Sequence, residues 1–212
     1  MIMSKKLNTP NTLSLIRVLL VPFFIASALY LKDFAILGRV VPALFFALAS
    51  FTDFLDGHIA RKYHLITDFG KFIDPLADKF MVFGACITIL TVDTQIAPVF
   101  VWVSAVVMLR ELAVTSMRLV VAGKSGKVIA ASFFGKLKTV SQIIAILVIF
   151  LEPLIAQGVA ACTFLGPVYA FATNFFAYRV LSYVFMSLMA VTTVASGIDY
   201  MRAYMPLIDT NK

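Results

Sequence analysis

Six long apolar runs account for most of this chain of 212 residues. They cover about 11–31, 37 to the region of Asp53, 69–92, 97–121, 134–151 and 175–200. Most are close to the ~20 residues that an α-helix needs to cross the hydrocarbon core of a bilayer. We therefore expect one all-α transmembrane domain over residues 1–212, built as a six-helix bundle. The polar residues 4–9 predict a short N-terminal segment on the membrane surface.

The composition supports a membrane class. Hydrophobic residues make up 61% of the chain, charged residues 14%, and the mean hydropathy is +0.97. Because a soluble domain carries about 45–50% apolar and about 25% charged residues, an ordinary soluble protein is excluded. Strand-like alternation is absent, so helices rather than a barrel should satisfy the backbone. The first run follows Lys5 and Lys6 as in a signal peptide, but Arg17 and Pro22 interrupt it, and we expect it to remain as a span.

The net charge of +7 comes from cations that flank the apolar runs. We expect these cations to meet lipid headgroups or phosphate substrates rather than nucleic acid. One side of the membrane would hold only Lys32, Arg39 and Arg179. The other would hold Lys5, Lys6, Arg61, Lys62, Lys71, Arg118, Lys124, Lys127, Lys136, Lys138, Arg202 and Lys212. Because basic residues mark the cytoplasmic side, this asymmetry predicts cytoplasmic termini.

Four aspartates lie near the connection between the second and third apolar runs: two at the end of the second run and two in the first part of the third. Asp53 and Asp56 are spaced i, i+3, and Asp74 and Asp78 are spaced i, i+4, so each pair occupies one face of a helix. A short polar turn at 62–68 should make the two spans antiparallel neighbours, so the pairs can converge. An acidic residue near membrane depth is costly and by default predicts a functional site.

The aspartates favour a divalent-cation site. Four converging carboxylates would repel one another strongly at low dielectric, and oxygen ligands favour Mg²⁺, Mn²⁺ or Ca²⁺ over zinc. His58 and His64 are interpreted as loop residues, and Cys86 and Cys162 as packing residues. Two-metal sites can clamp a phosphoryl group during in-line displacement. Three nearby small residues would let a nucleotide approach closely: Gly57, Ala60 and Gly70. The guanidinium of Arg61 can donate two parallel hydrogen bonds to a phosphate. Together these residues suggest a pyrophosphate-linked substrate.

The full spacing, D-x2-D-G-x2-A-R-x8-G-x3-D-x3-D, resembles the motif of the CDP-alcohol phosphatidyltransferase family at every position. The resemblance implies a six-helix membrane enzyme, usually dimeric, with two Mg²⁺ or Mn²⁺ ions on the cytoplasmic side. It implies that Asp78 is the general base and that the four aspartates hold the metals. It also implies a CDP-diacylglycerol site formed by Asp56, Gly57, Ala60, Arg61 and Gly70.

Several matches outside the motif resemble bacterial phosphatidylglycerophosphate synthases. They are Asn8-Thr-Pro10-Asn11, Ile16-Arg17, Arg110-Glu111 with Arg118, Gly135-Lys136-Leu-Lys138-Thr139 and Ser196-Gly197-Ile-Asp199-Tyr200. This branch implies transfer of the phosphatidyl group from CDP-diacylglycerol to glycerol 3-phosphate, for phospholipid synthesis in the bacterial inner membrane. Segment 152–174 has no match of this kind, and we assign it no role.

The phosphate of such an acceptor needs cations. Arg110 within a span needs a partner, which could be Glu111 or a motif aspartate. Glu111 and Arg118 share a helical face, and Arg110 is rotated away from it. Residues 136 and 138 cannot both face inward from a regular helix. We name Arg118 and Lys136 first for the acceptor phosphate, then Arg110 and Lys138, with Asn11, Arg17, Glu111 and Thr139 as further pocket candidates.

Other interpretations stay open. Aspartates at a helix end can simply face water, small residues in membrane helices can simply pack, and each lysine can be a solvated charge. Within the same reaction class the acceptor could be inositol phosphate, serine or phosphatidylglycerol. A divalent-cation transporter could use the same aspartates, and a scaffold protein could keep the fold without activity.

Overall fold

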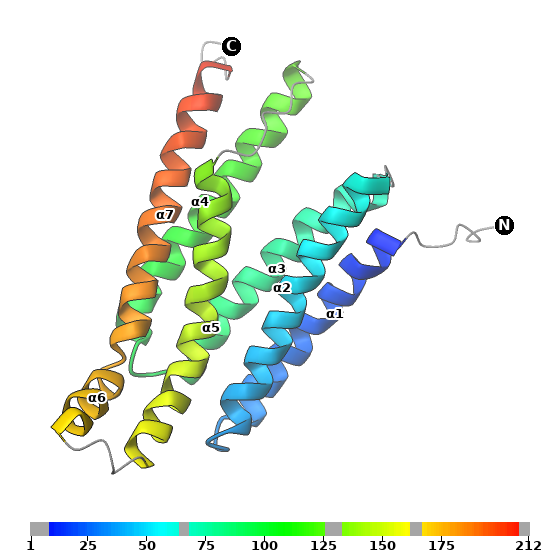
Figure 1. Cartoon of the computed structure of the whole chain (residues 1–212). Helices are drawn as coiled ribbons and strands as arrows, with labels where there is room; N and C mark the ends of the chain where they lie inside the picture. Colours follow the sequence, from blue (N-terminus) through cyan, green and yellow to red (C-terminus); the bar gives the residue numbers. More distant parts are fainter. Residues whose placement is uncertain (1–8, 64–67, 126–132, 162–166, 208–212) are drawn as a thin grey trace. The chain divides into compact units, whose positions relative to one another are not determined.

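The computed structural model describes residues 9–63, 68–125, 133–161 and 167–207. These residues form seven α-helices and a short 3₁₀ helix (Figure 1), and the described ranges contain no strand. The elements are α1 (Thr9–Tyr30), α2 (Leu37–Tyr63), α3 (Asp68–Val92), α4 (Ala97–Ser125), α5 (Phe133–Ala161), α6 (Pro167–Ala177), α7 (Val180–Tyr204) and η2 (Met205–Leu207). They fall into two compact units, Met1–Val92 and Asp93–Lys212. The predicted surface segment at 4–9 lies almost wholly outside the described residues.

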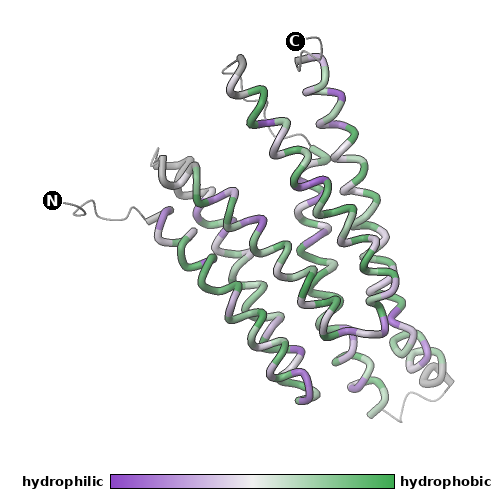
Figure 2. Tube along the Cα trace, turned by 180° about the vertical axis from the view of Figure 1, so that it is seen from behind, coloured by the Kyte–Doolittle hydropathy of each residue, from purple (hydrophilic) through white to green (hydrophobic). Residues whose placement is uncertain are grey.

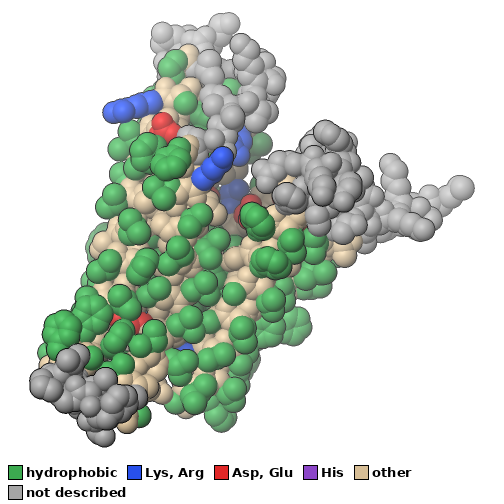
Figure 3. Space-filling model, in the orientation of Figure 1, with side chains coloured by type: hydrophobic (Ala, Val, Ile, Leu, Met, Phe, Trp, Pro, Cys, Tyr) green, Lys and Arg blue, Asp and Glu red, His purple; other side chains and the backbone are tan. Residues whose placement is uncertain are grey.

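Within the described ranges, six helices are long and apolar enough to cross a membrane. They are α1 to α5 and α7, which confirms the predicted all-α membrane fold. Figure 2 shows that the apolar residues run along these helices, and in Figure 3 hydrophobic side chains cover most of the described surface in view. Large apolar side chains such as Trp102 and Leu109 are exposed, as expected for helices that face lipid.

In the first unit, α1 packs against both α2 and α3. Its buried face includes Val21, Phe24 and Ala28 at helical spacing. The rings of Phe24 and Phe46 lie 5.7 Å apart and join α1 to α2. A Cβ atom at Gly84 would lie 3.0 Å from Cγ1 of Val21. A side chain at position 84 would therefore require Val21 to shift by a few tenths of an ångström, so the glycine allows the close approach of α1 and α3 seen here.

In the second unit, α7 packs against α4 and α5, and α6 packs against α5 and α7. Val114 and Val121 of α4 form a buried cluster with Tyr200 and Tyr204 of α7. Hydroxyl groups also join α5 to α7, because Oγ of Ser141 lies 2.7 Å from Oγ1 of Thr192. Polar pairs of this kind are a common way for membrane helices to associate.

The fifth span is longer than predicted. We expected Glu152-Pro153 to end it, yet α5 continues to Ala161. A proline inside a helix leaves the carbonyl four residues earlier without its usual N–H donor. Here that carbonyl belongs to Ile149, and Nη2 of Arg179 donates to it at 2.7 Å. A side chain from a later segment thus satisfies the freed carbonyl, and the helix passes through Pro153.

The sixth span differs in the opposite way. We expected one helix over 175–200, but the chain breaks between α6 and α7 at Arg179, which has φ 56° and ψ 39°. Its Nη1 donates to Asp93 at 2.8 Å and its Nε to Glu152 at 3.3 Å. Glu152 in turn accepts from the backbone N–H groups of Leu181 (2.9 Å) and Ser182 (2.8 Å) at the start of α7.

This cluster lies in the interior of the second unit. Arg179, which was assigned to the less basic side of the membrane, is buried together with Asp93 and Glu152. Segment 152–174, to which we gave no role, holds the end of α5 and most of α6 in its described part. His58 lies within α2 rather than in a loop, whereas His64 and Cys162 lie outside the described residues.

Candidate functional site

The first helix places three polar residues on one buried face. Asn11, Ser14 and Arg17 follow one another at intervals of three, and each is less than a tenth exposed. The Arg17 side chain is completely buried. A buried guanidinium requires compensating charge, and the partners of Arg17 are the aspartates of the motif.

Arg17 joins both aspartate pairs. Its Nη1 lies 3.0 Å from Oδ1 of Asp53 on α2 and donates at 2.6 Å to Oδ1 of Asp78 on α3. Its Nη2 forms an ion pair with Asp56, also on α2. One side chain of α1 therefore holds carboxylates from two other helices around a single positive charge.

Ser14 connects the fourth aspartate to this group. Its Oγ donates to Asp74 and lies 3.3 Å from Oδ2 of Asp56. All four motif aspartates thus lie around two neighbouring residues on one face of α1. Each of those residues contacts carboxylates from both α2 and α3.

The group carries excess negative charge and is partly open. Three carboxylates contact one guanidinium, and the side chain of Asp56 is only 8% exposed, against 36% for Asp53 and 50% for Asp78. Among the described residues, no three His, Cys, Asp or Glu side chains are arranged to hold a metal ion. The donor set nevertheless suits a hard cation, because it offers carboxylate and hydroxyl oxygens alone.

The remaining motif residues flank the aspartates. Gly57 is in α2 next to Asp56, and Gly70 is buried in the first turn of α3. Ala60 and Arg61 lie in the last two turns of α2, and their side chains are outside the described set. The structure therefore places the predicted nucleotide-binding positions at the same helix ends as the aspartates.

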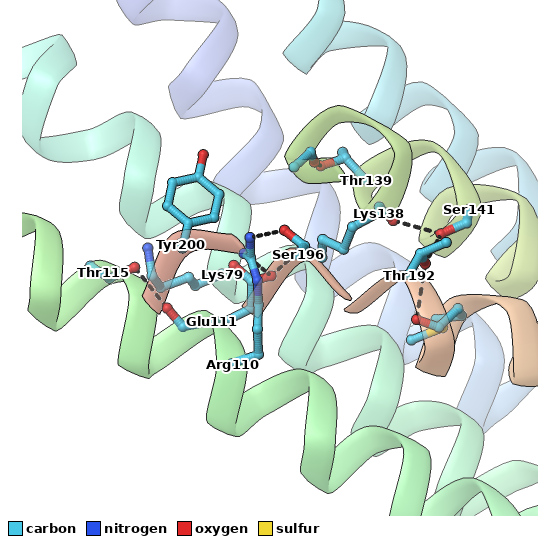
Figure 4. A network of polar contacts seen from close by, with 12 residues as sticks. Lys79, Arg110, Glu111, Thr115, Lys138, Thr139, Ser141, Thr192, Ser196 and Tyr200 are labelled. Carbon is cyan, nitrogen blue, oxygen red and sulfur yellow. Dashed lines mark hydrogen bonds and ion pairs between the residues drawn. The ribbon is translucent and has the colours of Figure 1, made fainter. Parts of the chain in front are cut away.

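The second unit contains a separate basic group (Figure 4). Lys138 of α5 forms an ion pair with Glu111 of α4, and Nη1 of Arg110 lies 3.3 Å from the same carboxylate. Of the two possible partners for Arg110, Glu111 is the one observed. Lys138 is buried and Lys136 is exposed, so only one of these two lysines faces the helix bundle.

Arg118 and Arg110 meet at one aromatic ring. The guanidinium carbon of Arg110 lies 5.2 Å from the centre of the Tyr200 ring, and that of Arg118 lies 5.7 Å from it. The sequence placed these two arginines on different faces of α4, and both nevertheless reach the same residue of α7. Thr139 is exposed, and its hydroxyl donates to the carbonyl of Gly135 in its own helix.

Comparison with known proteins establishes the family. The family model for CDP-alcohol phosphatidyltransferases matches residues 7–195. The chain belongs to this family. Members generally depend on divalent cations, which agrees with the oxygen-rich donor set around Ser14 and Arg17.

Curated family members from several bacteria are similar to the chain. A protein of Bacillus subtilis named CDP-diacylglycerol–glycerol-3-phosphate 3-phosphatidyltransferase is 42% identical over 156 residues, which cover 69% of this chain and 78% of the relative. A protein of the same name from Haemophilus influenzae is 39% identical, over 66% of the chain and 74% of the relative. A probable phosphatidylglycerophosphate synthase of Mycobacterium tuberculosis is 35% identical, over 91% of the chain and 79% of the relative.

The sequence did not point to three residues that contact the predicted site residues: Ser14, Ser196 and Tyr200. Ser14 stands midway between Asn11 and Arg17, and that spacing of three could have revealed it. Ser196 and Tyr200 belong to a stretch that resembled the family branch, but no role was given to them. Their role depends on the packing of α7 against α4, which the spacing within one helix does not show.

Proposed function

We propose that this protein transfers the phosphatidyl group of CDP-diacylglycerol to glycerol 3-phosphate, giving phosphatidylglycerophosphate and CMP. The observation that carries the proposal is the similarity to the Bacillus subtilis enzyme of that name, 42% identical over 78% of its length. The complete aspartate motif and its convergence on Arg17 and Ser14 support the same reaction class.

Asp53, Asp56, Asp74 and Asp78 would hold the divalent cations, two Mg²⁺ or Mn²⁺ ions. Such ions neutralise the pyrophosphate and stabilise the charge that develops on the leaving phosphate. Arg17 supplies positive charge to three of these carboxylates. The metal ligands are thus gathered before the substrate arrives, which lowers the cost of organising them.

Asp78 is proposed as the general base. It is the most exposed of the three aspartates that contact Arg17, so an acceptor hydroxyl can reach it. It takes the proton of the acceptor's primary hydroxyl as that oxygen attacks the phosphorus of the phosphatidyl group. The new phosphorus–oxygen bond forms as the bond to CMP breaks, and CMP leaves with the bonding electron pair.

Binding of the two substrates is proposed for separate groups of residues. Asp56, Gly57, Ala60, Arg61 and Gly70 would bind CDP-diacylglycerol. Arg118, Lys136, Arg110 and Lys138 would bind the acceptor phosphate. Further pocket candidates are Asn11, Arg17, Glu111 and Thr139. The burial of Lys138 in an ion pair with Glu111 favours it over the exposed Lys136 as part of an organised group.

The membrane setting follows from the spans and charges. The protein is a multi-pass membrane protein, and we propose the bacterial inner membrane with both termini and the aspartates on the cytoplasmic side. We further propose that residues 1–212 act as one catalytic domain and that two copies form a homodimer, as the family resemblance implies. Labelling of cysteines introduced near each end of the chain, from either side of sealed vesicles, tests the orientation.

An acceptor panel tests the proposed function. Purified protein would receive Mg²⁺, CDP-diacylglycerol labelled in the glycerol backbone, and one alcohol at a time: glycerol 3-phosphate, inositol phosphate, serine or phosphatidylglycerol. We expect labelled phosphatidylglycerophosphate with glycerol 3-phosphate and little product with the others. A preference for another alcohol would keep the reaction class and overturn the assigned acceptor.

A further inference from the structure

One face of α7, formed by Ser196, Gly197 and Tyr200, contacts two arginines of α4. Nη2 of Arg110 donates to Oγ of Ser196 at 2.6 Å. The guanidinium groups of Arg110 and Arg118 both lie close to the Tyr200 ring, and the Tyr200 hydroxyl accepts from Nη2 of Arg118 at 3.4 Å. Figure 4 shows Arg110 reaching across to Ser196 with the Tyr200 ring beside it.

Gly197 gives Arg110 the room to lie along this face. A Cβ atom at position 197 would lie 3.4 Å from Cγ of Arg110, so alanine would just touch the arginine and a larger side chain would displace it. Arg110 therefore donates to the Ser196 hydroxyl, lies along the backbone at Gly197, and lies close to the Tyr200 ring. Each of these contacts restricts rotamers that a long side chain otherwise samples.

The Tyr200 ring is itself held in place. It stacks on Tyr204 with ring centres 5.9 Å apart and planes at 20°, and both residues are buried. A rigid aromatic face attracts guanidinium groups through the ring quadrupole. Because both arginines lie close to this one ring, it brings together two charges that would otherwise repel.

The guanidinium of Arg110 keeps binding capacity. Its Nη1 and Nη2 contact Glu111 and Ser196 and each carries a second N–H, while Nε is buried without a hydrogen-bond partner among the described residues. Arg118 is exposed. Two neighbouring arginines with donors to spare form an arrangement suited to a phosphate dianion.

We propose that Ser196, Gly197 and Tyr200 are positioning residues that orient Arg110 and Arg118 for the phosphate of the acceptor. They act through the arginines and do not themselves contact the acceptor. This inference rests on the proposed function, because it gives the two arginines their role in that reaction. It predicts that changes on this face of α7 weaken acceptor binding and leave the CDP-diacylglycerol site unchanged.

Steady-state kinetics with each substrate varied in turn provides the first test. Ser196→Ala removes the hydroxyl acceptor, and Tyr200→Leu removes the ring. We expect KM for glycerol 3-phosphate to rise about tenfold in Tyr200→Leu, since two cation–π contacts are lost, and roughly fivefold in Ser196→Ala. KM for CDP-diacylglycerol should stay within about twofold of wild type. Tyr200→Phe keeps the ring, and its KM for glycerol 3-phosphate should be close to that of the wild type.

Val194→Ala is the matched control, because Val194 is exposed on α7 two residues before Ser196. It should leave both KM values unchanged. If Tyr200→Leu lowers the melting temperature, Ser196→Ala still tests the proposal, because this small change keeps the packing of α7. Equal KM values for glycerol 3-phosphate in Ser196→Ala, Tyr200→Leu and Val194→Ala would overturn the proposal, as would a parallel loss for both substrates.

Chemical labelling separates this inference from the proposed function. Phenylglyoxal modifies accessible arginines, and mass spectrometry reads the rate at each site without any turnover. We expect Arg110, which is 11% exposed in its side chain, to react several times faster in Ser196→Ala and Tyr200→Leu than in Val194→Ala. Unchanged labelling of Arg110 would contradict the positioning role even if the wild type turned out to use a different acceptor.

Discussion

Replacing Arg179 by methionine should lower the free energy of unfolding by about 3 kcal/mol. The change keeps an unbranched side chain and removes the guanidinium contacts: Nη1 to Asp93 at 2.8 Å, Nε to Glu152 at 3.3 Å, Nη2 to the Ile149 carbonyl at 2.7 Å, and two contacts with Oγ of Ser182. Removing one member of a buried ion pair costs about 3–5 kcal/mol because a charge remains buried without compensation. The lower end applies because Glu152 keeps the backbone donors of α7.

The assay is unfolding in detergent micelles, followed by circular dichroism as denaturant is added. Arg202→Met is the control, since Arg202 is exposed in the last turn of α7, and it should cost less than about 1 kcal/mol. A difference below about 1 kcal/mol between the two variants would refute the inference that the Arg179 cluster holds α5 and α7 together.

Three further predictions concern the charged groups. Asp78→Asn should abolish phosphatidyl transfer while CDP-diacylglycerol still binds, measured by turnover and ligand binding; near-wild-type turnover would rule out the base role. Arg17→Gln should widen the gap in melting temperature between chelator and Mg²⁺, because the carboxylates lose their internal counter-charge, and an unchanged gap counts against this. Lys138→Met should lower the free energy of unfolding by about 2 kcal/mol, whereas Lys136→Met should change it by less than about 0.5 kcal/mol; equal effects would contradict the observed burial.

The number and class of the spans could be predicted because hydropathy over ~20 residues is a property of the sequence alone. The course of the chain around Pro153 and Arg179 could not be predicted from the sequence. Whether a proline ends a helix depends on whether another group satisfies the freed carbonyl, and the group that does so here comes from 30 residues further along the chain. The same arginine interrupts, near its start, the apolar run that had been interpreted as one helix over 175–200.

The candidate site, like the fold, could be predicted from the sequence in part. Spacing placed the aspartates in two pairs on two helices, and Arg17 was named as a pocket candidate without a partner. The structure adds that Arg17 and Ser14 lie between the pairs, which required the packing of α1 against α2 and α3. Helical spacing alone rotated Arg110 and Arg118 apart, because long side chains can converge on a residue of another helix.

The central claim is that the aspartate site transfers the phosphatidyl group from CDP-diacylglycerol to an alcohol. The most direct measurement is the yield of CMP and of lipid product by mass spectrometry, from purified protein with Mg²⁺, CDP-diacylglycerol and glycerol 3-phosphate. We predict equal amounts of CMP and phosphatidylglycerophosphate, with neither formed by Asp78→Asn. Absence of CMP from the wild type, together with divalent-cation flux in liposomes that contain it, would contradict the claim and favour a transporter.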